Sequence, residues 1–297
     1  MGPGLALVFA LGGHETALYS RKQETLDRAM MMARESLATL VDHGTVTLAA
    51  ADRALAMLHP TQSVEAAGRE ADFVMEPIAE NKDAKAALYA ELDGICPDRT
   101  IFASNTSSLN VFELVPGVRQ PHTVVAHFFA PAHIIPLAEV VPGPRTGVHI
   151  LAFVADFLEA CGKTPVLMKK FGPGFVVNRI QRAIGETCMD MVQEGLVEPE
   201  EIDQAIKATL GIRLPVVGVM QTFDFQGLDM LLAYQRNVGK VYSFVEERVE
   251  RGELGAKTSK GIYDYQGRSE AEILKKRDEL YLKMIDYLTE IGAFEPV

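Results

Sequence analysis

The feature that most constrains the fold is the regular alternation of helical and extended patterns through the first part of the chain. Apolar residues recur at helical spacing over Gln23–Asp42, and a strand pattern follows at Asp72–Ile78. Further segments continue the alternation: strands at Thr100–Ser104, Thr123–Phe129, Leu137–Val141 and Thr164–Lys169, and helices at Asn81–Leu92 and Thr146–Cys161. This order predicts an α/β fold with a mainly parallel sheet covered by helices on both faces.

The alternation stops after the last of these strands, and only helical patterns follow. Pro173-Gly174 opens a helix whose apolar residues step by four. A second helix begins at Pro199 and is expected to stop at Gly211, and a charged amphipathic helix covers Ala271–Phe294. We therefore expect two domains, residues 1–171 and an all-helical domain at residues 172–297.

Composition excludes several classes of protein. The 297 residues are 48% hydrophobic, which is enough to bury a sizeable core. The net charge is −11 and the basic residues are scattered, so we expect no nucleic-acid partner. No apolar run approaches the roughly 20 residues that a membrane span needs, so we expect a soluble protein with no membrane partner.

The cysteines give no sign of a disulfide framework or a metal site. There are three, Cys96, Cys161 and Cys188, with no CxxC spacing and no paired histidines of the metal-binding kind. We expect reduced thiols in a cytoplasmic protein that binds no metal.

The N-terminus resembles the second half of a dinucleotide-binding fingerprint. Gly2 and Gly4 open a helix of small residues that leads into a strand at Glu15–Tyr19. In a full Rossmann-type fingerprint a strand and earlier glycines come first, and helix N–H groups meet the pyrophosphate. We therefore expect a Rossmann-type doubly wound sheet whose first strand is missing from this sequence. A start codon assigned too late or a truncation would explain this, and a flexible N-terminus is the alternative.

Ser20 and Arg21 stand where an NAD site usually offers an acid to the ribose. A hydroxyl and a guanidinium suit a 2′-phosphate better than a carboxylate does, which leaves NADP open beside NAD. The alternative is that Arg21 faces solvent while NAD binds without the acid.

One histidine and one glutamate could perform the chemistry of alcohol oxidation. His127 lies near the end of a predicted strand, and Glu139 lies 139 − 127 = 12 residues later on the next strand. Side by side, the carboxylate would stabilise the imidazolium that forms when His127 takes a hydroxyl proton. Each candidate also has a structural alternative. His127 is one of seven histidines and could be structural, Ser107 could be a turn residue, and Asn178 could be a polar residue on the surface.

Several motifs together resemble the 3-hydroxyacyl-CoA dehydrogenase family. They lie in the family's order over nearly the whole chain: Ser104-Asn105-Thr106-Ser107-Ser108-Leu109, His127-Phe128-Phe129, Leu137-Ala138-Glu139-Val140, Pro173-Gly174-Phe175-Val176-Val177-Asn178-Arg179, Glu80-Asn81 with Lys85, Asp224 to Asp229, and Lys257-Thr258 with Gly261 and Tyr263. The resemblance implies an NAD-dependent oxidoreductase of fatty acid metabolism that forms a homodimer through its helical domain.

The resemblance also implies roles for individual residues. His127 would be the base and Glu139 its partner, and Ser107 and Asn178 would hold the substrate. The cofactor site would include Glu80, Lys85 and Lys257, together with Ser107 and the residues named above (Gly2, Gly4, Ser20 and Arg21).

Three departures from the family pattern bear on the substrate. Ala130 stands where hydroxyacyl-CoA enzymes usually have Asn, and Pro136 stands where they commonly have Lys. No lysine lies between Lys22 and Lys82 to meet CoA phosphates, although Ser36 matches a family CoA contact. We favour a 3-hydroxyacyl-CoA substrate, with a small free hydroxy acid of the carnitine, gulonate or pyridine-carboxylate type as the alternative. A non-catalytic, crystallin-like scaffold is the third hypothesis.

Overall fold

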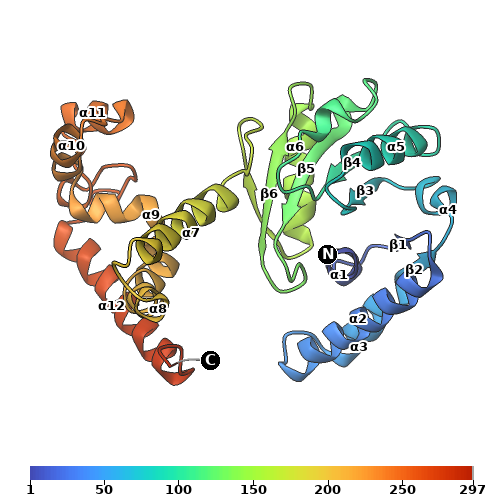
Figure 1. Cartoon of the computed structure of the whole chain (residues 1–297), viewed down its shortest axis with the longest axis horizontal. Coiled ribbons are helices and arrows are strands. Elements are labelled where there is room, and N and C mark those ends of the chain that lie inside the picture. The colour runs from blue at the N-terminus through green and yellow to red at the C-terminus, as the bar shows by residue number, and fades with distance from the viewer. Residues whose placement is uncertain (296–297) are drawn as a thin grey trace. The chain divides into compact units, whose positions relative to one another are not determined.

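The computed structural model describes residues 1–295, and the chain divides into two compact units. Unit 1 is Met1–Ala183 and unit 2 is Ile184–Val297. Unit 1 contains all seven strands, and the described part of unit 2 is helical apart from two isolated bridges (Figure 1). The predicted α/β fold followed by a helical region is therefore confirmed.

A five-stranded sheet forms the centre of unit 1. Its strands lie in sequence order: β3 (Phe73–Glu76), β4 (Ile101–Ser104), β5 (Thr123–Phe128), β6 (Leu137–Pro142) and β7 (Thr164–Leu167). All neighbours are parallel except β5 and β6, which pair antiparallel. The carboxyl ends of β3, β4 and β5 therefore meet at one edge of the sheet, where ligands of open α/β sheets bind.

Helices cover both faces of this sheet. Leu5 and Phe9 of α1 (Gly2–Leu11) and Val154 of α6 (Val148–Ala160) pack with inward residues of β4, β5 and β6 on one face. Tyr89 and Leu92 of α5 (Lys82–Asp93) pack on the other face. Adjacent residues of β4 and β5 alternate between the two clusters, as expected for strands buried on both sides.

A second, two-stranded parallel sheet accompanies α1 in unit 1. It pairs β1 (Thr16–Tyr19) with β2 (Leu58–Thr61), and no strand hydrogen bonds join it to the larger sheet in residues 1–295. The connections between and after its strands are helical: α2 (Gln23–Asp42), α3 (Leu48–Ala56) and α4 (Val64–Gly68). Strand β2 was not predicted from the sequence, because Pro60 lies inside it and proline usually marks an edge strand or no strand.

The helices beyond the last strand differ from expectation at two points. The helix expected to open at Pro173-Gly174 begins at Val177, because Gly174 (φ 75°) and Phe175 (φ 48°) are left-handed. The expected stop at Gly211 is wrong. The preceding helix ends at Ala208, since Thr209 leaves helical geometry (φ −131°, ψ −74°), and Gly211 lies in the first turn of the next helix.

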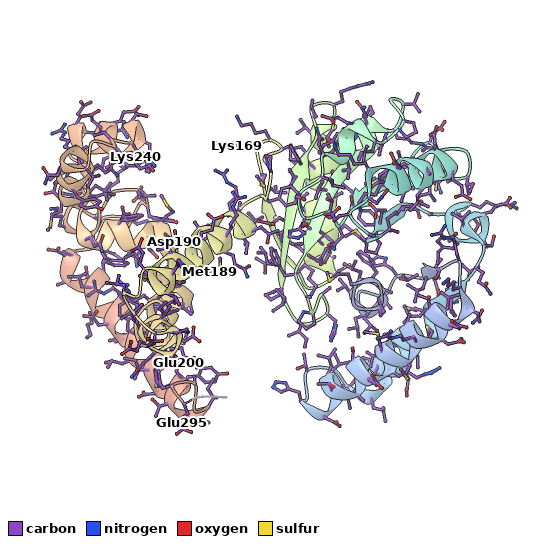
Figure 2. The ribbon with its side chains drawn as sticks, in the orientation of Figure 1. Lys169, Met189, Asp190, Glu200, Lys240 and Glu295 are labelled. Carbon is purple, nitrogen blue, oxygen red and sulfur yellow. The ribbon has the colours of Figure 1, made fainter. Side chains whose placement is uncertain are left out.

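Within residues 1–295, six α-helices follow β7, and the first includes residues of both units: α7 (Val177–Gln193), α8 (Pro199–Ala208), α9 (Leu210–Gln226), α10 (Leu228–Asn237), α11 (Ser243–Glu250) and α12 (Glu270–Glu290). Figure 2 labels Met189 on α7, a residue that is 65% exposed, and Glu200 at the start of α8. None of the described helices combines the length and the apolar character that crossing a membrane requires.

Candidate active site

His127 and Glu139 lie directly opposite each other on the antiparallel strands β5 and β6. Side chains in that register leave the same face of the sheet and lie close together. The imidazole Nδ1 is 2.8 Å from Oε2 of Glu139. His127 is 6% exposed and Glu139 is fully buried, so the pair is shielded from bulk water except at the imidazole.

The second oxygen of Glu139 is held by the backbone at the start of α7. Oε1 accepts hydrogen bonds from the amides of Val176 (2.8 Å) and Val177 (2.9 Å). The left-handed turn at Gly174 and Phe175 precedes these two amides. Burial alone would raise the pKa of Glu139, but the His127 hydrogen bond and the two amides outweigh it and lower the pKa. Glu139 is therefore an anion at neutral pH.

The charge on Glu139 determines the tautomer of His127. An ionised carboxylate only accepts hydrogen bonds, so Nδ1 of the ring carries the proton that is donated to it. The rings of Phe129 and Phe175 lie 4.6 Å and 5.4 Å from the imidazole centroid and confine it. No hydrogen bond joins Nε2 to any residue between 1 and 295, so this nitrogen keeps a free lone pair. The arrangement suits a general base.

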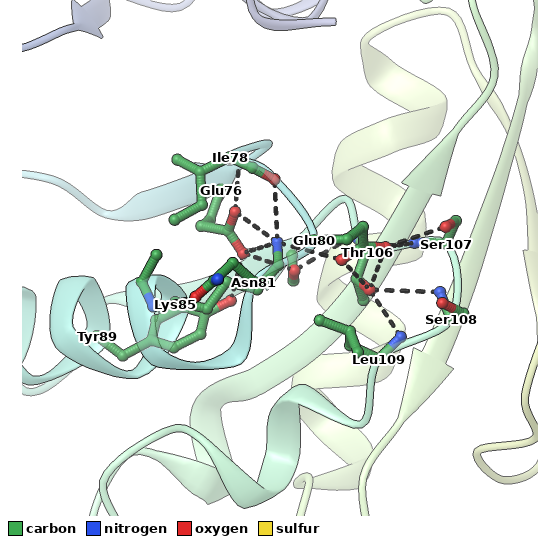
Figure 3. Close-up of polar contacts among 12 residues, drawn as sticks. Glu76, Ile78, Glu80, Asn81, Lys85, Tyr89, Thr106, Ser107, Ser108 and Leu109 are labelled. Atoms are coloured by element: carbon green, nitrogen blue, oxygen red, sulfur yellow. Dashed lines mark hydrogen bonds and ion pairs between the residues drawn. The ribbon is translucent and has the colours of Figure 1, made fainter.

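Ser107 follows β4 and is bound to Glu80, which follows β3. Glu80 accepts from the Ser107 amide (2.6 Å), the Ser107 hydroxyl (3.0 Å) and the Thr106 hydroxyl (2.8 Å), as Figure 3 shows. Burial raises the pKa of Glu80, but these hydrogen bonds and the nearby charge of Lys85 bring it below its usual value. With its proton directed to Glu80, the Ser107 oxygen keeps lone pairs for another donor.

Asn178 and Asn105 connect the site to its surroundings. Asn178 is the second residue of α7 and directly follows the two amides that hold Glu139. Asn105, which the sequence analysis did not single out, accepts from the Phe128 amide at 2.8 Å and so ties the end of β4 to the end of β5. The sequence signal that could have identified Asn105 is its place in the Ser104–Leu109 motif.

The N-terminus of α1 has the features of an anion site. Its first turn contains no acidic residue, and no side chain caps it. A Cβ added at Gly2 would meet nothing within 4 Å, so a ligand atom can approach the backbone there. A Cβ at Gly4 would lie 3.3 Å from His133 Nδ1. Unclaimed amides and the positive end of the helix dipole fit a pyrophosphate.

Ser20 and Arg21 directly follow β1, which pairs with β2 beside α1 in unit 1. Arg21 is exposed, and it makes no ion pair with any residue up to Glu295. Its guanidinium is therefore available to a ligand.

The two lysines of the predicted cofactor site are already paired. Lys85 is 1% exposed, and its ammonium lies 2.8 Å from a carboxylate oxygen of Glu76. Lys257 lies in unit 2, where its ammonium is 2.5 Å and 2.7 Å from the carboxylate oxygens of Asp229. The roles of Lys85 and Lys257 at the cofactor stay predictions.

Comparison with known proteins gives matches to both parts of the chain. The model of the 3-hydroxyacyl-CoA dehydrogenase NAD binding domain matches residues 1–171, and that of the family's C-terminal domain matches residues 174–265. A 5-formyl-3-hydroxy-2-methylpyridine 4-carboxylate 5-dehydrogenase of Mesorhizobium japonicum is 32% identical over 273 residues, covering 89% of this chain and 87% of the relative.

Two further matches carry the hydroxyacyl-CoA name. A probable 3-hydroxybutyryl-CoA dehydrogenase of Bacillus subtilis is 33% identical over 278 residues, covering 91% of this chain and 95% of the relative. The crystal structure of a 3-hydroxyacyl-CoA dehydrogenase of Archaeoglobus fulgidus has a TM-score of 0.80 at 26% identity, covering 97% of this chain and 95% of that one.

Proposed function

Because the chain belongs to the 3-hydroxyacyl-CoA dehydrogenase family and is an NAD-binding oxidoreductase, we propose that it oxidises a 3-hydroxyacyl-CoA to the 3-ketoacyl-CoA. This is a reaction of fatty acid metabolism. The observation that carries the proposal is the buried His127–Glu139 pair, with Nδ1 bound to an ionised carboxylate and Nε2 free. A base of this kind is what oxidation of a secondary alcohol needs.

In the proposed reaction, Nε2 of His127 takes the hydroxyl proton of the substrate. The carbon that carries the hydroxyl loses a hydride, and its C–O bond becomes the carbonyl of the product. NAD, when bound, supplies the acceptor for that hydride. Glu139 stabilises the imidazolium while the proton stays on His127. We assign Ser107 and Asn178 to holding the substrate: Ser107 lies two residues after Asn105, which binds the Phe128 amide next to His127, and Asn178 follows Val177, whose amide binds Glu139.

A negative charge at the start of α1 is expected to weaken NAD binding. Gly2→Asp fits without a clash, because a side chain there meets open space. Its carboxylate repels the pyrophosphate, so we expect the Kd for NAD to rise about 10-fold or more by calorimetry. The same charge stabilises the helix N-terminus by roughly 0.3–1 kcal/mol, so the Tm should not fall.

Gly2→Asn is the matched control for that variant, because it has nearly the same shape and no charge. It should keep the wild-type Kd within a small factor. Equal losses of affinity in the two variants would show that the pyrophosphate does not bind at this end of the helix.

A small free hydroxy acid is the second candidate substrate, and the charge of α2 favours it. This helix carries four acidic residues (Glu24, Asp27, Glu35 and Asp42) against two basic ones (Arg28 and Arg34), a net charge of −2. An acidic helix attracts CoA phosphates poorly. Ala130 and Pro136 also favour the free acid, because both depart from the pattern of hydroxyacyl-CoA enzymes. The Mesorhizobium relative is named for a pyridine carboxylate.

A substrate panel tests the proposed function. Formation of NADH or NADPH is followed with 3-hydroxybutyryl-CoA, free 3-hydroxybutyrate and L-carnitine, each with NAD and with NADP. We expect the highest kcat/KM with the CoA thioester. Higher values with a free acid would establish the second candidate, and no turnover with any member would favour the scaffold hypothesis. Equal Kd values for NAD and NADP would show that Ser20 and Arg21 do not discriminate between the two cofactors.

We further propose the domain boundary and the setting of the enzyme. An NAD-binding domain at residues 1–171 and a helical substrate and dimerisation domain at residues 172–297 accord with the two family-model matches. The three unpaired cysteines suit the cytoplasm. Light scattering of the purified protein should give the mass of a homodimer, and a monomeric mass would exclude it.

A further inference from the structure

Glu76, the last residue of β3, is a buried carboxylate at the centre of a polar network. It is 2% exposed. Its two oxygens accept from the amide of Ile78 (2.6 Å), the ammonium of Lys85 (2.8 and 2.9 Å) and the hydroxyl of Tyr89 (2.7 Å), which Figure 3 labels. They also accept from the hydroxyl of Ser104 (2.8 Å). All of its hydrogen-bonding capacity is therefore used within the protein.

The charges of Glu76 and Lys85 depend on each other. Both side chains are almost completely excluded from solvent. A buried charge that loses its partner costs several kcal/mol, whereas the intact pair is satisfied by the surrounding donors and acceptors. Burial and the charge of Glu76 raise the pKa of Tyr89 well above its usual value, so this hydroxyl stays a neutral donor.

Two routes lead from Glu76 to Ser107. In the first, Lys85 lies 3.7 Å from Glu80, whose carboxylate holds the amide and the hydroxyl of Ser107. In the second, the Ser104 hydroxyl that donates to Glu76 accepts from the amide of Thr106, one residue before Ser107, at 3.2 Å. The Ser107 loop is thus connected to Glu76 both through Lys85 and Glu80 and through Ser104.

We propose that Glu76 is a positioning residue for the reaction: by neutralising Lys85 it leaves the Glu80 carboxylate free to orient Ser107. This inference rests on the proposed function, in which Ser107 contacts the substrate. Without the charge of Glu76, the nearest carboxylate to Lys85 among residues 1–295 is Glu80. Lys85 would then compete with Ser107 for Glu80, and the serine would lose its orientation.

The decisive variants are Glu76→Gln and the double variant Glu76→Gln with Lys85→Met. Gln keeps the size of Glu76 and removes its charge, and Met fills most of the space of Lys85 without an ammonium. We expect Glu76→Gln to lower kcat by about 10- to 100-fold, the value of a hydrogen bond to a charged group. The double variant should recover most of that loss, because no unpaired ammonium competes for Glu80.

Rescue by the double variant separates positioning from simple structural damage. Both variants lack the carboxylate of Glu76, and only the single variant keeps an ammonium that competes for Glu80. With the Tm of both variants measured, a folded double variant no more active than a folded Glu76→Gln would overturn the proposal. If the single variant does not fold, the double variant decides: a folded but inactive double variant also overturns it.

A second readout does not need turnover. The Ser107 amide donates to Glu80 at 2.6 Å, so its proton resonance should lie downfield in the wild type. It should move upfield in Glu76→Gln and return in the double variant. An unchanged resonance in the single variant would contradict the proposal whatever the substrate is. Loss of the proposed function would instead appear as an inactive wild-type enzyme.

Discussion

His127→Gln is expected to lower kcat by about 10²- to 10⁴-fold, which is the usual contribution of a general base. Glutamine has a similar size and can still donate to Glu139, but it cannot take a proton at neutral pH. The KM for substrate should change little, because the imidazole acts on the proton in the transition state. Steady-state NADH formation at several pH values measures both parameters.

His149→Gln is the matched control, since His149 lies exposed on α6. It should keep the wild-type kcat, and the Tm of both variants should stay close to that of the wild type. A His127→Gln enzyme with full kcat would end the assignment of His127 as the base.

Glu139→Gln is expected to reduce both activity and stability. The carboxylate accepts from His127 and from the amides of Val176 and Val177, and it is fully buried. An amide presents an NH₂ group to one of these donors and carries no charge to stabilise the imidazolium. We expect kcat to fall at least about 100-fold and the free energy of unfolding to fall by about 2–4 kcal/mol in urea denaturation.

The control for this variant is Glu159→Gln, which makes the same change at an exposed position of α6. It should leave kcat and the urea midpoint unchanged. An equally stable and active Glu139→Gln enzyme would show that the carboxylate does not support His127.

The stability conferred by Glu139 should depend on pH in a defined direction. Its pKa is lower in the folded protein than in the unfolded chain, where a glutamate titrates near about 4.3. The stabilisation is thus complete above that unfolded value and is lost as pH falls through the folded pKa. The difference in unfolding free energy between wild type and Glu139→Gln should therefore shrink on acidification below about pH 4.3.

Much of the architecture could be predicted from the sequence. The doubly wound sheet and the helical continuation are confirmed, since short extended runs alternate with helical patterns along β3 to β7 and apolar residues recur at helical spacing in α2. The spacing of 12 residues between His127 and Glu139 predicted two neighbouring strands, and the register places the pair opposite each other. Contacts between two consecutive antiparallel strands depend on a short stretch of chain, so they can be predicted from the sequence.

Other features depend on the three-dimensional arrangement and left no local pattern. The amides of Val176 and Val177 reach Glu139 across a separation of 37 and 38 residues, through a left-handed turn at Phe175 that its sequence does not demand. The buried ion pair between Lys85 and Glu76 could not be predicted from the sequence either. Whether a polar residue faces a ligand or another buried group is decided by tertiary packing.

Transfer of deuterium from substrate to cofactor tests the central claim most directly. The purified protein is mixed with NAD and 3-hydroxybutyryl-CoA that carries deuterium at the hydroxyl-bearing carbon, and the reduced nicotinamide is analysed by mass spectrometry. We expect one deuterium per reduced nicotinamide and a matching amount of ketoacyl-CoA, with both products forming about 10²- to 10⁴-fold more slowly in His127→Gln. Reduced nicotinamide without the label, or no reduced nicotinamide at all from the wild-type protein, would contradict it.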